Sequence, residues 1–192
     1  MHLKILKNKD GAVELSIGTI VIIVIAMSML ILGLILVKNI FTGSIYNVKS
    51  INDKVKEEIN NLFDKGEDKS IVYLSERKAE VEQGAEWGVA FAFRNLETGT
   101  TQDSTFSYEV VASDLGTDCK GLTKAQAESW IKSRRSNSLS LPPGDKYHTI
   151  ARFQIPEDAP LCIIPFNIEV KKDGAIYTTD FFDLIIKAKG LL

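Results

Sequence analysis

The sequence predicts an α+β protein in which a long N-terminal helix is followed by an antiparallel, immunoglobulin-like β-sandwich. Two observations support this prediction. Residues 15–37 form an apolar run with no charge and no proline, LSIGTIVIIVIAMSMLILGLILV. Beyond residue 70, by contrast, hydrophobic residues recur with a period of two. The first pattern is typical of a helix that is apolar on every side, and the second of half-buried strands.

The apolar run is long enough to cross a membrane. As a helix it would measure about 35 Å at 1.5 Å per residue, against about 30 Å for the hydrocarbon core of a bilayer. Lys4, Lys7 and Lys9 precede the run, whereas Lys38 alone closes it. This bias predicts a cytoplasmic N-terminus and an external C-terminal domain. The run is longer than the apolar core of a secretory signal, so we expect it to stay in the mature protein.

Residues 7–33, KNKDGAVELSIGTIVIIVIAMSMLILG, resemble the N-termini of archaeal type IV pilin-like proteins, a group that includes pilins and archaellins. The resemblance covers about residues 7–41. It implies a leader, the class III signal peptide, at residues 1–11, which a prepilin peptidase removes between Gly11 and Ala12. Asp10 departs from the pattern, because the family usually has Lys or Arg there. The resemblance also implies a homo-oligomeric filament whose core is built from the N-terminal helices.

Four residues near or within the run are candidates for assembly. The resemblance implies that Glu14 neutralises the terminal amine of a neighbouring subunit. Alternatively, Glu14 lies in the first helical turn, where a negative charge suits the helix dipole. Thr19, Ala26 and Gly33 recur every seven residues and would form a stripe of small residues that allows close helix packing. Chance placement explains the stripe equally well.

The helical pattern continues as an amphipathic extension over residues 38–64, so one helix is expected over residues 12–64. Its apolar positions follow four-three spacing, with Asn52 filling the missing position: Phe41, Ile45, Val48, Val55, Ile59 and Leu62. This stripe packs either against a partner helix or against the chain's own C-terminal domain. Residues 65–70 then form a linker in which Gly66 is available as the helix C-cap.

Residues 71–190 are expected to form the sandwich. Five main strands are predicted at residues 87–94, 106–111, 147–153, 164–170 and 176–187, with short additions at 71–74 and 79–82. Six or seven short strands in this length suit an immunoglobulin-like fold. Thr123 followed by Gln126 is a capping box, which predicts an inserted helix over about residues 123–133.

Cys119 and Cys162 are the two cysteines of the chain. In a domain outside the cytoplasm they most simply form one disulfide. It would close a loop of about 43 residues, worth about 3–4 kcal/mol in the chain-entropy model. Two free buried thiols are the alternative.

No residue pattern points to catalysis, a cofactor or a metal. The sequence has no glycine-rich phosphate loop, no HExxH and no EF-hand loop, and its two histidines, His2 and His148, are far apart. The net charge is −2 without a block of basic residues, which argues against nucleic acid as a partner. We therefore expect a protein that is not an enzyme.

The predicted function is that of a structural subunit of a surface filament. Membrane lipid would cover its helix before assembly, and the β-domain would be exposed for adhesion to surfaces or cells. The alternative is a permanently anchored single-pass protein with an extracellular immunoglobulin-like binding domain. Both share the same topology up to cleavage of the leader.

Overall fold

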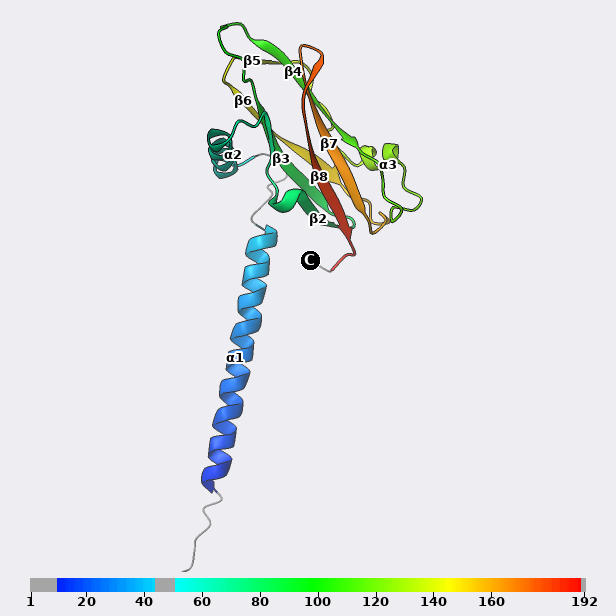
Figure 1. The fold of residues 1–192 in the computed structure, drawn as a ribbon. Helices are drawn as coiled ribbons and strands as arrows, with labels where there is room; N and C mark the ends of the chain where they lie inside the picture. The colour runs from blue at the N-terminus through cyan, green and yellow to red at the C-terminus, as the bar shows by residue number, and fades with distance from the viewer. Residues whose placement is uncertain (1–9, 44–50, 191–192) are drawn as a thin grey trace, which may run out of the picture. The chain divides into compact units, whose positions relative to one another are not determined.

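The structure is a computed structural model that describes the backbone of residues 10–43 and 51–190 and the side chains of residues 18–35 and 51–190. The chain divides into two units, Met1–Ile45 and Tyr46–Leu192. The first unit contains one long helix, and the second contains the remaining helices and all the strands that the structure describes (Figure 1).

The first unit is built on α1, Asp10–Gly43, a helix of 34 residues. Its middle part is rich in Ile and Val, which have only moderate helix propensity in water. In an apolar environment, however, a helix satisfies every backbone N–H and C=O internally, and this requirement outweighs propensity. The Ser28 hydroxyl donates to the Val24 carbonyl at 2.7 Å, so this polar group is also satisfied within the helix. The predicted apolar helix is therefore present.

The prediction of one unbroken helix over residues 12–64 is wrong at Asn52. A second helix, α2, runs from Asp53 to Lys65 and has Asn52 as its N-cap, in extended conformation. The Asn52 side-chain oxygen accepts a hydrogen bond from the Val55 N–H at 2.8 Å. Asparagine is favoured at this position because its short side chain satisfies an N–H that the first helical turn leaves unpaired. The residue expected in a helix–helix seam therefore begins a helix instead. The Gly66 N–H bonds to the Phe63 carbonyl at the other end of α2, where a C-cap was expected.

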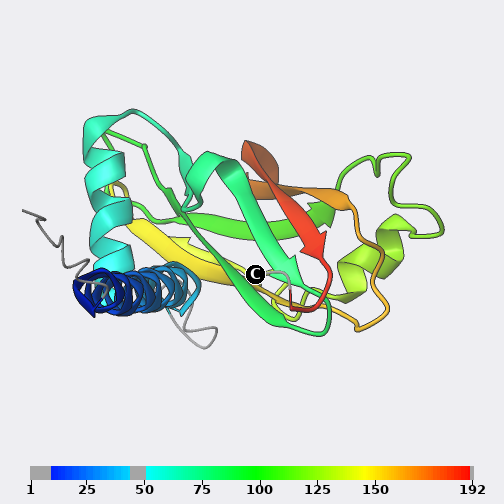
Figure 2. The ribbon, with the colours of Figure 1, turned by 90° about the horizontal axis from the view of Figure 1, so that it is seen from below.

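The strands of the second unit form two sheets (Figure 2). The three-stranded sheet has the order β1-β3-β6, and the five-stranded sheet has the order β2-β8-β7-β4-β5. The strands are β1 (Ser70–Val72), β2 (Lys78–Glu82), β3 (Glu86–Arg94), β4 (Ser104–Ala112), β5 (Leu139–Leu141), β6 (Lys146–Gln154), β7 (Ile163–Lys172) and β8 (Ala175–Lys187). Every strand predicted from the period of two is present, and β5 is an addition. The predicted capping box also begins a helix, α3 (Lys124–Ser129).

The expectation of a purely antiparallel, immunoglobulin-like sandwich is met only in part. The domain is mostly β and most strand pairs are antiparallel, but β2 pairs in parallel with β8, so the five-stranded sheet is mixed. A short 3-10 helix, η1 (Ser75–Arg77), carries the chain from β1 to β2. Glu76 and Arg77 there have φ of 50° and 58°. This left-handed backbone is uncommon for residues other than glycine, and the period of two in the sequence does not reveal it.

The main core lies between the two sheets and is rich in phenylalanine. Phe153, Phe166 and Phe182 meet at ring-centroid distances between 5.2 and 5.9 Å. One side of the sandwich is bridged by the segment after α3. The Lys132 N–H donates to the Arg152 carbonyl of β6 at 2.7 Å, and the Val110 N–H of β4 donates to the Arg134 carbonyl at 2.8 Å.

A second, smaller core lies on the outer face of the three-stranded sheet, where α2 docks. Ile59 and Phe63 of α2 are fully buried against Ala90, Ala92 and Ile150. We expected β3 to be half-buried, but it is covered on both faces. The small side chains of Ala90 and Ala92 on its outward face leave room for the helix.

Candidate functional site

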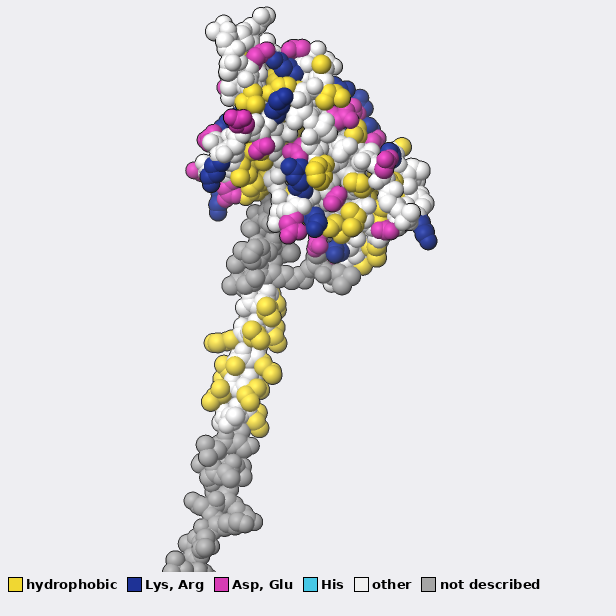
Figure 3. Space-filling model, viewed as in Figure 1, with side chains coloured by type: hydrophobic (Ala, Val, Ile, Leu, Met, Phe, Trp, Pro, Cys, Tyr) yellow, Lys and Arg dark blue, Asp and Glu magenta, His cyan; other side chains and the backbone are white. Residues whose placement is uncertain are grey.

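The main candidate site is the apolar surface of α1. Every large hydrophobic side chain between Ile20 and Ile35 is between 48% and 71% exposed. Figure 3 shows these side chains along the described part of the helix. Each such side chain left in water instead of an apolar environment costs about 1.5–3 kcal/mol. This surface therefore requires a cover, which lipid or other apolar helices can supply.

The dimensions of this surface suit a bilayer. The segment Gly18–Ile35 is apolar enough to span a membrane. Its 18 residues measure about 27 Å as a helix, close to the thickness of the hydrocarbon core. By length and composition, α1 fits a membrane span and, given its position near the N-terminus, also a signal sequence.

The predicted small-residue stripe lies on the described part of α1. Thr19, Ala26 and Gly33 are exposed, and a spacing of seven residues keeps them within about 20° of one another per step around the helix. A methyl group added at Gly33 would meet no atom within 4 Å. The stripe is therefore open to a partner. Gly11, Ala12 and Glu14 lie in the first part of α1, and their side chains fall outside the described residues.

The predicted disulfide is present in the β-domain. Cys119 and Cys162 have a sulfur–sulfur distance of 2.05 Å and a Cα–Cα distance of 5.3 Å. Both residues are buried, with exposed fractions of 4% and 6%. The bond joins the loop that precedes α3 to the residue before β7.

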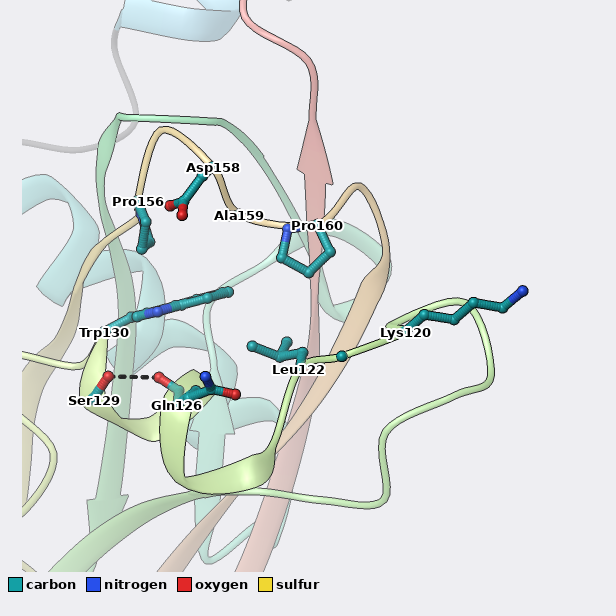
Figure 4. A pocket seen from close by; sticks show the side chains of 10 residues that line it. Lys120, Leu122, Gln126, Ser129, Trp130, Pro156, Asp158, Ala159 and Pro160 are labelled. Atoms are coloured by element: carbon teal, nitrogen blue, oxygen red, sulfur yellow. Dashed lines mark hydrogen bonds between the residues drawn. The ribbon is translucent and has the colours of Figure 1, made fainter.

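A pocket of about 400 Å³ lies between α3 and the loop from β6 to β7 (Figure 4). The capping box orients α3, since the Thr123 N–H donates to the Gln126 side-chain oxygen at 2.8 Å. Trp130, which is 8% exposed, follows α3 and lies beside Pro156 and Pro160. Asp158 lines the same pocket, and the Lys120 side chain extends away from the indole in Figure 4. The sequence did not indicate this pocket, because its walls come from two segments well separated along the chain.

The described residues were expected to hold no metal site, and they contain no cluster of metal-binding side chains. Among them, no group of three or more His, Cys, Asp and Glu side chains lies close enough to hold a metal ion. His148 Nε2 lies 3.0 Å from the side-chain oxygen of Asn60, so its partner there is an amide and not a carboxylate. Burial, followed by the positive charges of Lys56 and Lys146, lowers the pKa of His148 below its usual value of 6.5.

No family model and no curated protein matches this sequence. A family 123 glycoside hydrolase from Clostridium perfringens is similar over 71% of this chain and 25% of its own chain, with a TM-score of 0.44 and 13% identity. A Niemann-Pick type C2 protein from the Japanese carpenter ant is similar over 62% of this chain and 89% of its own, with a TM-score of 0.39 and 14% identity. A class 5 fimbriae chaperone is similar over 61% and 54%, with a TM-score of 0.31 and 8% identity. Likenesses this weak carry no argument about the function of this chain.

Proposed function

We propose that the chain is a structural subunit of an archaeal-type surface filament, of the type IV pilin-like kind. The observation that carries the proposal is the uncovered apolar surface of α1, whose described side chains are exposed on all sides of the helix. A mature protein that keeps this helix needs an apolar partner for its surface. A filament subunit uses it twice, first in the membrane and then in the filament core.

The transfer from lipid to filament is energetically reasonable. Lipid tails and apolar side chains cover a helix about equally well, so leaving the bilayer for a bundle of helices loses little hydrophobic stabilisation. Association then depends on close packing. Small residues favour such packing because they let helix backbones approach each other. Thr19, Ala26 and Gly33 supply them on one face of α1.

Processing follows from the same proposal. A prepilin-peptidase-like enzyme would cut between Gly11 and Ala12 and remove three lysines and one aspartate, which changes the net charge from −2 to about −4. Glu14 would then lie close to the new terminal amine. A carboxylate at membrane depth is costly unless it has a partner, and a neighbouring amine would supply one.

The β-domain would lie outside the cytoplasm and form the exterior of the filament. Its disulfide is consistent with an oxidising compartment. We assign it a role in display and adhesion, with no enzymatic activity.

The direct test is the mass of the mature N-terminus. The protein is purified from cells with and without the prepilin peptidase and digested, and its N-terminal peptide is sequenced by mass spectrometry. The proposal expects Ala12 as the first residue in normal cells and Met1 in cells without the peptidase. A chain that begins at Met1 in both would overturn the assignment as a processed pilin.

One observation favours the alternative of a permanently anchored protein. Helix α1 begins at Asp10, so the bond between Gly11 and Ala12 lies within its first turn, which must open before a peptidase can cut it. In that case α1 stays in the membrane, and the β-domain binds a ligand or partner at the cell surface. An uncut chain that is extracted from membranes as a single copy would support this reading.

A further inference from the structure

A second pocket lies where the N-terminal end of α2 packs against β6; we call it the α2–β6 pocket. Its volume is about 350 Å³. The residues used in the argument are Lys56, Ser133, His148, Thr149, Ile150 and Arg152, all of which line it. They come from α2, β6 and the segment after α3, so the fold brings together residues that are remote in sequence.

The charges lining the pocket are positive. Lys56 projects from α2 and Arg152 from β6, and no carboxylate is among the described residues that line the pocket. The ion pair of Lys56 is with Asp53 at 3.6 Å, and Asp53 is fully exposed. Such a pair contributes little. The Arg152 guanidinium forms no ion pair within the described residues 51–190. Two exposed cations therefore lie at one cavity without full compensation.

His148 reports the same positive field. Its pKa is lowered first by burial and then by the charges of Lys56 and Lys146. Lys146 is itself paired with Asp64 of α2 at 3.0 Å, on the side away from Arg152. The imidazole nitrogen Nε2 is engaged with Asn60 at 3.0 Å. Lysines on α2 and on β6 thus both disfavour the protonated form of His148. An anion bound in the pocket would favour the protonated form and raise the pKa of His148.

Three hydroxyl groups also line the pocket, those of Tyr108, Ser133 and Thr149, and each has a partner within the protein. Thr149 Oγ1 lies 3.4 Å from the Tyr108 hydroxyl, and the two form a hydrogen bond with each other. Ser133 is already committed, because its hydroxyl donates to the Ile150 carbonyl at 2.8 Å and accepts from the Arg152 N–H at 2.9 Å. These contacts fix the backbone from which the Arg152 side chain projects.

We propose that the α2–β6 pocket binds a phosphate group, with Lys56 and Arg152 as its charged ligands. Arginine and lysine form short, charge-assisted hydrogen bonds with phosphate oxygens. The pocket exceeds a bare phosphate in size, so there is room for a small polar body attached to it. Phosphate can reach the pocket free in solution or as the headgroup of a phospholipid. The proposal does not depend on the filament function.

His148 is the built-in probe for the experiment. The full chain, labelled with ¹³C-histidine, is placed in phosphatidylcholine vesicles, and the imidazole pKa is followed by NMR. The His148 signal is assigned from its loss in His148→Gln. In one arm inorganic phosphate is added at constant ionic strength. In the other, phosphatidylglycerol replaces part of the phosphatidylcholine.

Binding is expected to raise the His148 pKa by about one unit, saturably, in at least one arm. Arg152→Gln is expected to weaken the phosphate response at least about tenfold. Lys54→Gln, which changes a lysine of α2 outside the pocket, is expected to leave the response intact. Lys56→Gln should weaken the response as Arg152→Gln does, and it keeps the test decisive if the arginine variant misfolds.

The two arms distinguish the source of the phosphate. A response to inorganic phosphate identifies a soluble ligand, and a response to phosphatidylglycerol alone identifies a lipid headgroup. The proposal is overturned by a His148 pKa that does not move in either arm. An equal response in Lys54→Gln, Lys56→Gln and Arg152→Gln would overturn it as well.

Discussion

Arg94 connects α2 to the three-stranded sheet through polar contacts, beside the apolar ones. Its guanidinium donates to the carbonyls of Phe63 at 3.1 Å and Gly66 at 2.8 Å, and its Nε donates to the Asp68 carbonyl at 2.8 Å. It also lies 5.2 Å from the centre of the Phe63 ring. The last carbonyls of a helix have no partner within the helix, and a cation suits the negative end of the dipole. Arg94 therefore satisfies and anchors the C-terminal end of α2.

Arg94→Met is expected to lower the free energy of unfolding by about 2–3 kcal/mol, because several carbonyls lose a charged donor at once. Urea denaturation of the full chain in detergent, followed by tryptophan fluorescence, measures this. Arg152→Met is the matched control on the neighbouring strand and is expected to stay within about 0.5 kcal/mol of the wild type. Equal effects of the two substitutions would contradict the assigned role of Arg94.

His148 gives the domain a defined pH dependence. Its pKa in the folded state is lowered by burial and by Lys56 and Lys146, so the unfolded chain binds a proton more readily. The free energy of unfolding should therefore be unaffected by this residue well above pH 6.5 and should fall as the pH drops below about 6.5. His148→Gln is expected to have a shallower decline between pH 7.5 and 5 in the same denaturation assay. A decline of unchanged slope in the variant would show that other groups cause it.

At the residue scale, local chemistry was predictable and long-range placement was not. Thr123 and Gln126 specify a helix start by themselves, and the structure has both capping hydrogen bonds. Asn52 was predicted to lie within a helix because it fills a position of the four-three spacing. The same position is the N-cap of α2, and the spacing does not distinguish these two roles. The position of His148 opposite Asn60 depends on how α2 docks, which neither residue's sequence neighbours reveal.

At the scale of elements, the disulfide is the strongest restraint on the α3 region. It closes a loop with a sequence separation of 43 residues that contains α3, β5 and β6. Changing both Cys119 and Cys162 to Ser is expected to lower the free energy of unfolding by about 4 kcal/mol, because the unfolded chain regains the entropy of the open loop. Urea denaturation with and without reductant measures this. The free energy of unfolding of the wild type in reductant should match that of the double variant. A difference between the two would contradict the stabilising role assigned to the disulfide.

Helix α2 can pack closely against β3 because the β3 side chains beneath it are small. Ala92 is fully buried under the helix, with an exposed fraction of 0%. Ala92→Leu should overpack this interface, cost about 1–3 kcal/mol and speed hydrogen exchange in α2. Val111→Leu adds bulk to the half-exposed outer face of the five-stranded sheet and is the control. Unchanged exchange in α2 of the Ala92 variant would contradict the docking described here.

The period of two identified most strands because it records which side chains face a core. It does not record the direction of a strand, so the parallel pairing of β2 with β8 was not foreseen. β5, Leu139–Leu141, spans three residues at the end of a loop-like stretch and was missed. Alternation also suggested that β3 is half-buried, whereas Ala90 and Ala92 on its outward face are buried beneath α2.

At the scale of the whole molecule, the two units differ in what they need from their surroundings. The β-domain buries its own apolar residues in two cores. The described part of α1 buries none of its large apolar residues. Because of this contrast, α1 fits a membrane span or a signal sequence. The apolar helix was predictable because an uninterrupted apolar run is a strong signal.

The small-residue stripe of α1 can be tested separately from membrane insertion. Ala26→Ile is expected to leave the protein in the membrane fraction but to prevent its appearance in extracellular filaments, because the larger side chain holds neighbouring helices apart. Val24→Ile enlarges a residue on another face of the same helix and should assemble normally. Cell fractionation and immunoblotting of sheared material give the readout. Normal assembly of the Ala26 variant would contradict a role of the small-residue stripe in helix packing.

The central claim is that copies of α1 replace lipid around one another. Cryo-electron microscopy of filaments sheared from cells, with the chain identified by mass spectrometry, tests it most directly. The account predicts filaments of this chain whose core consists of packed N-terminal helices, with the β-domains outside. It would be contradicted if cells that produce the chain carry it only in the membrane, and detergent releases it as single copies with no filament that contains it.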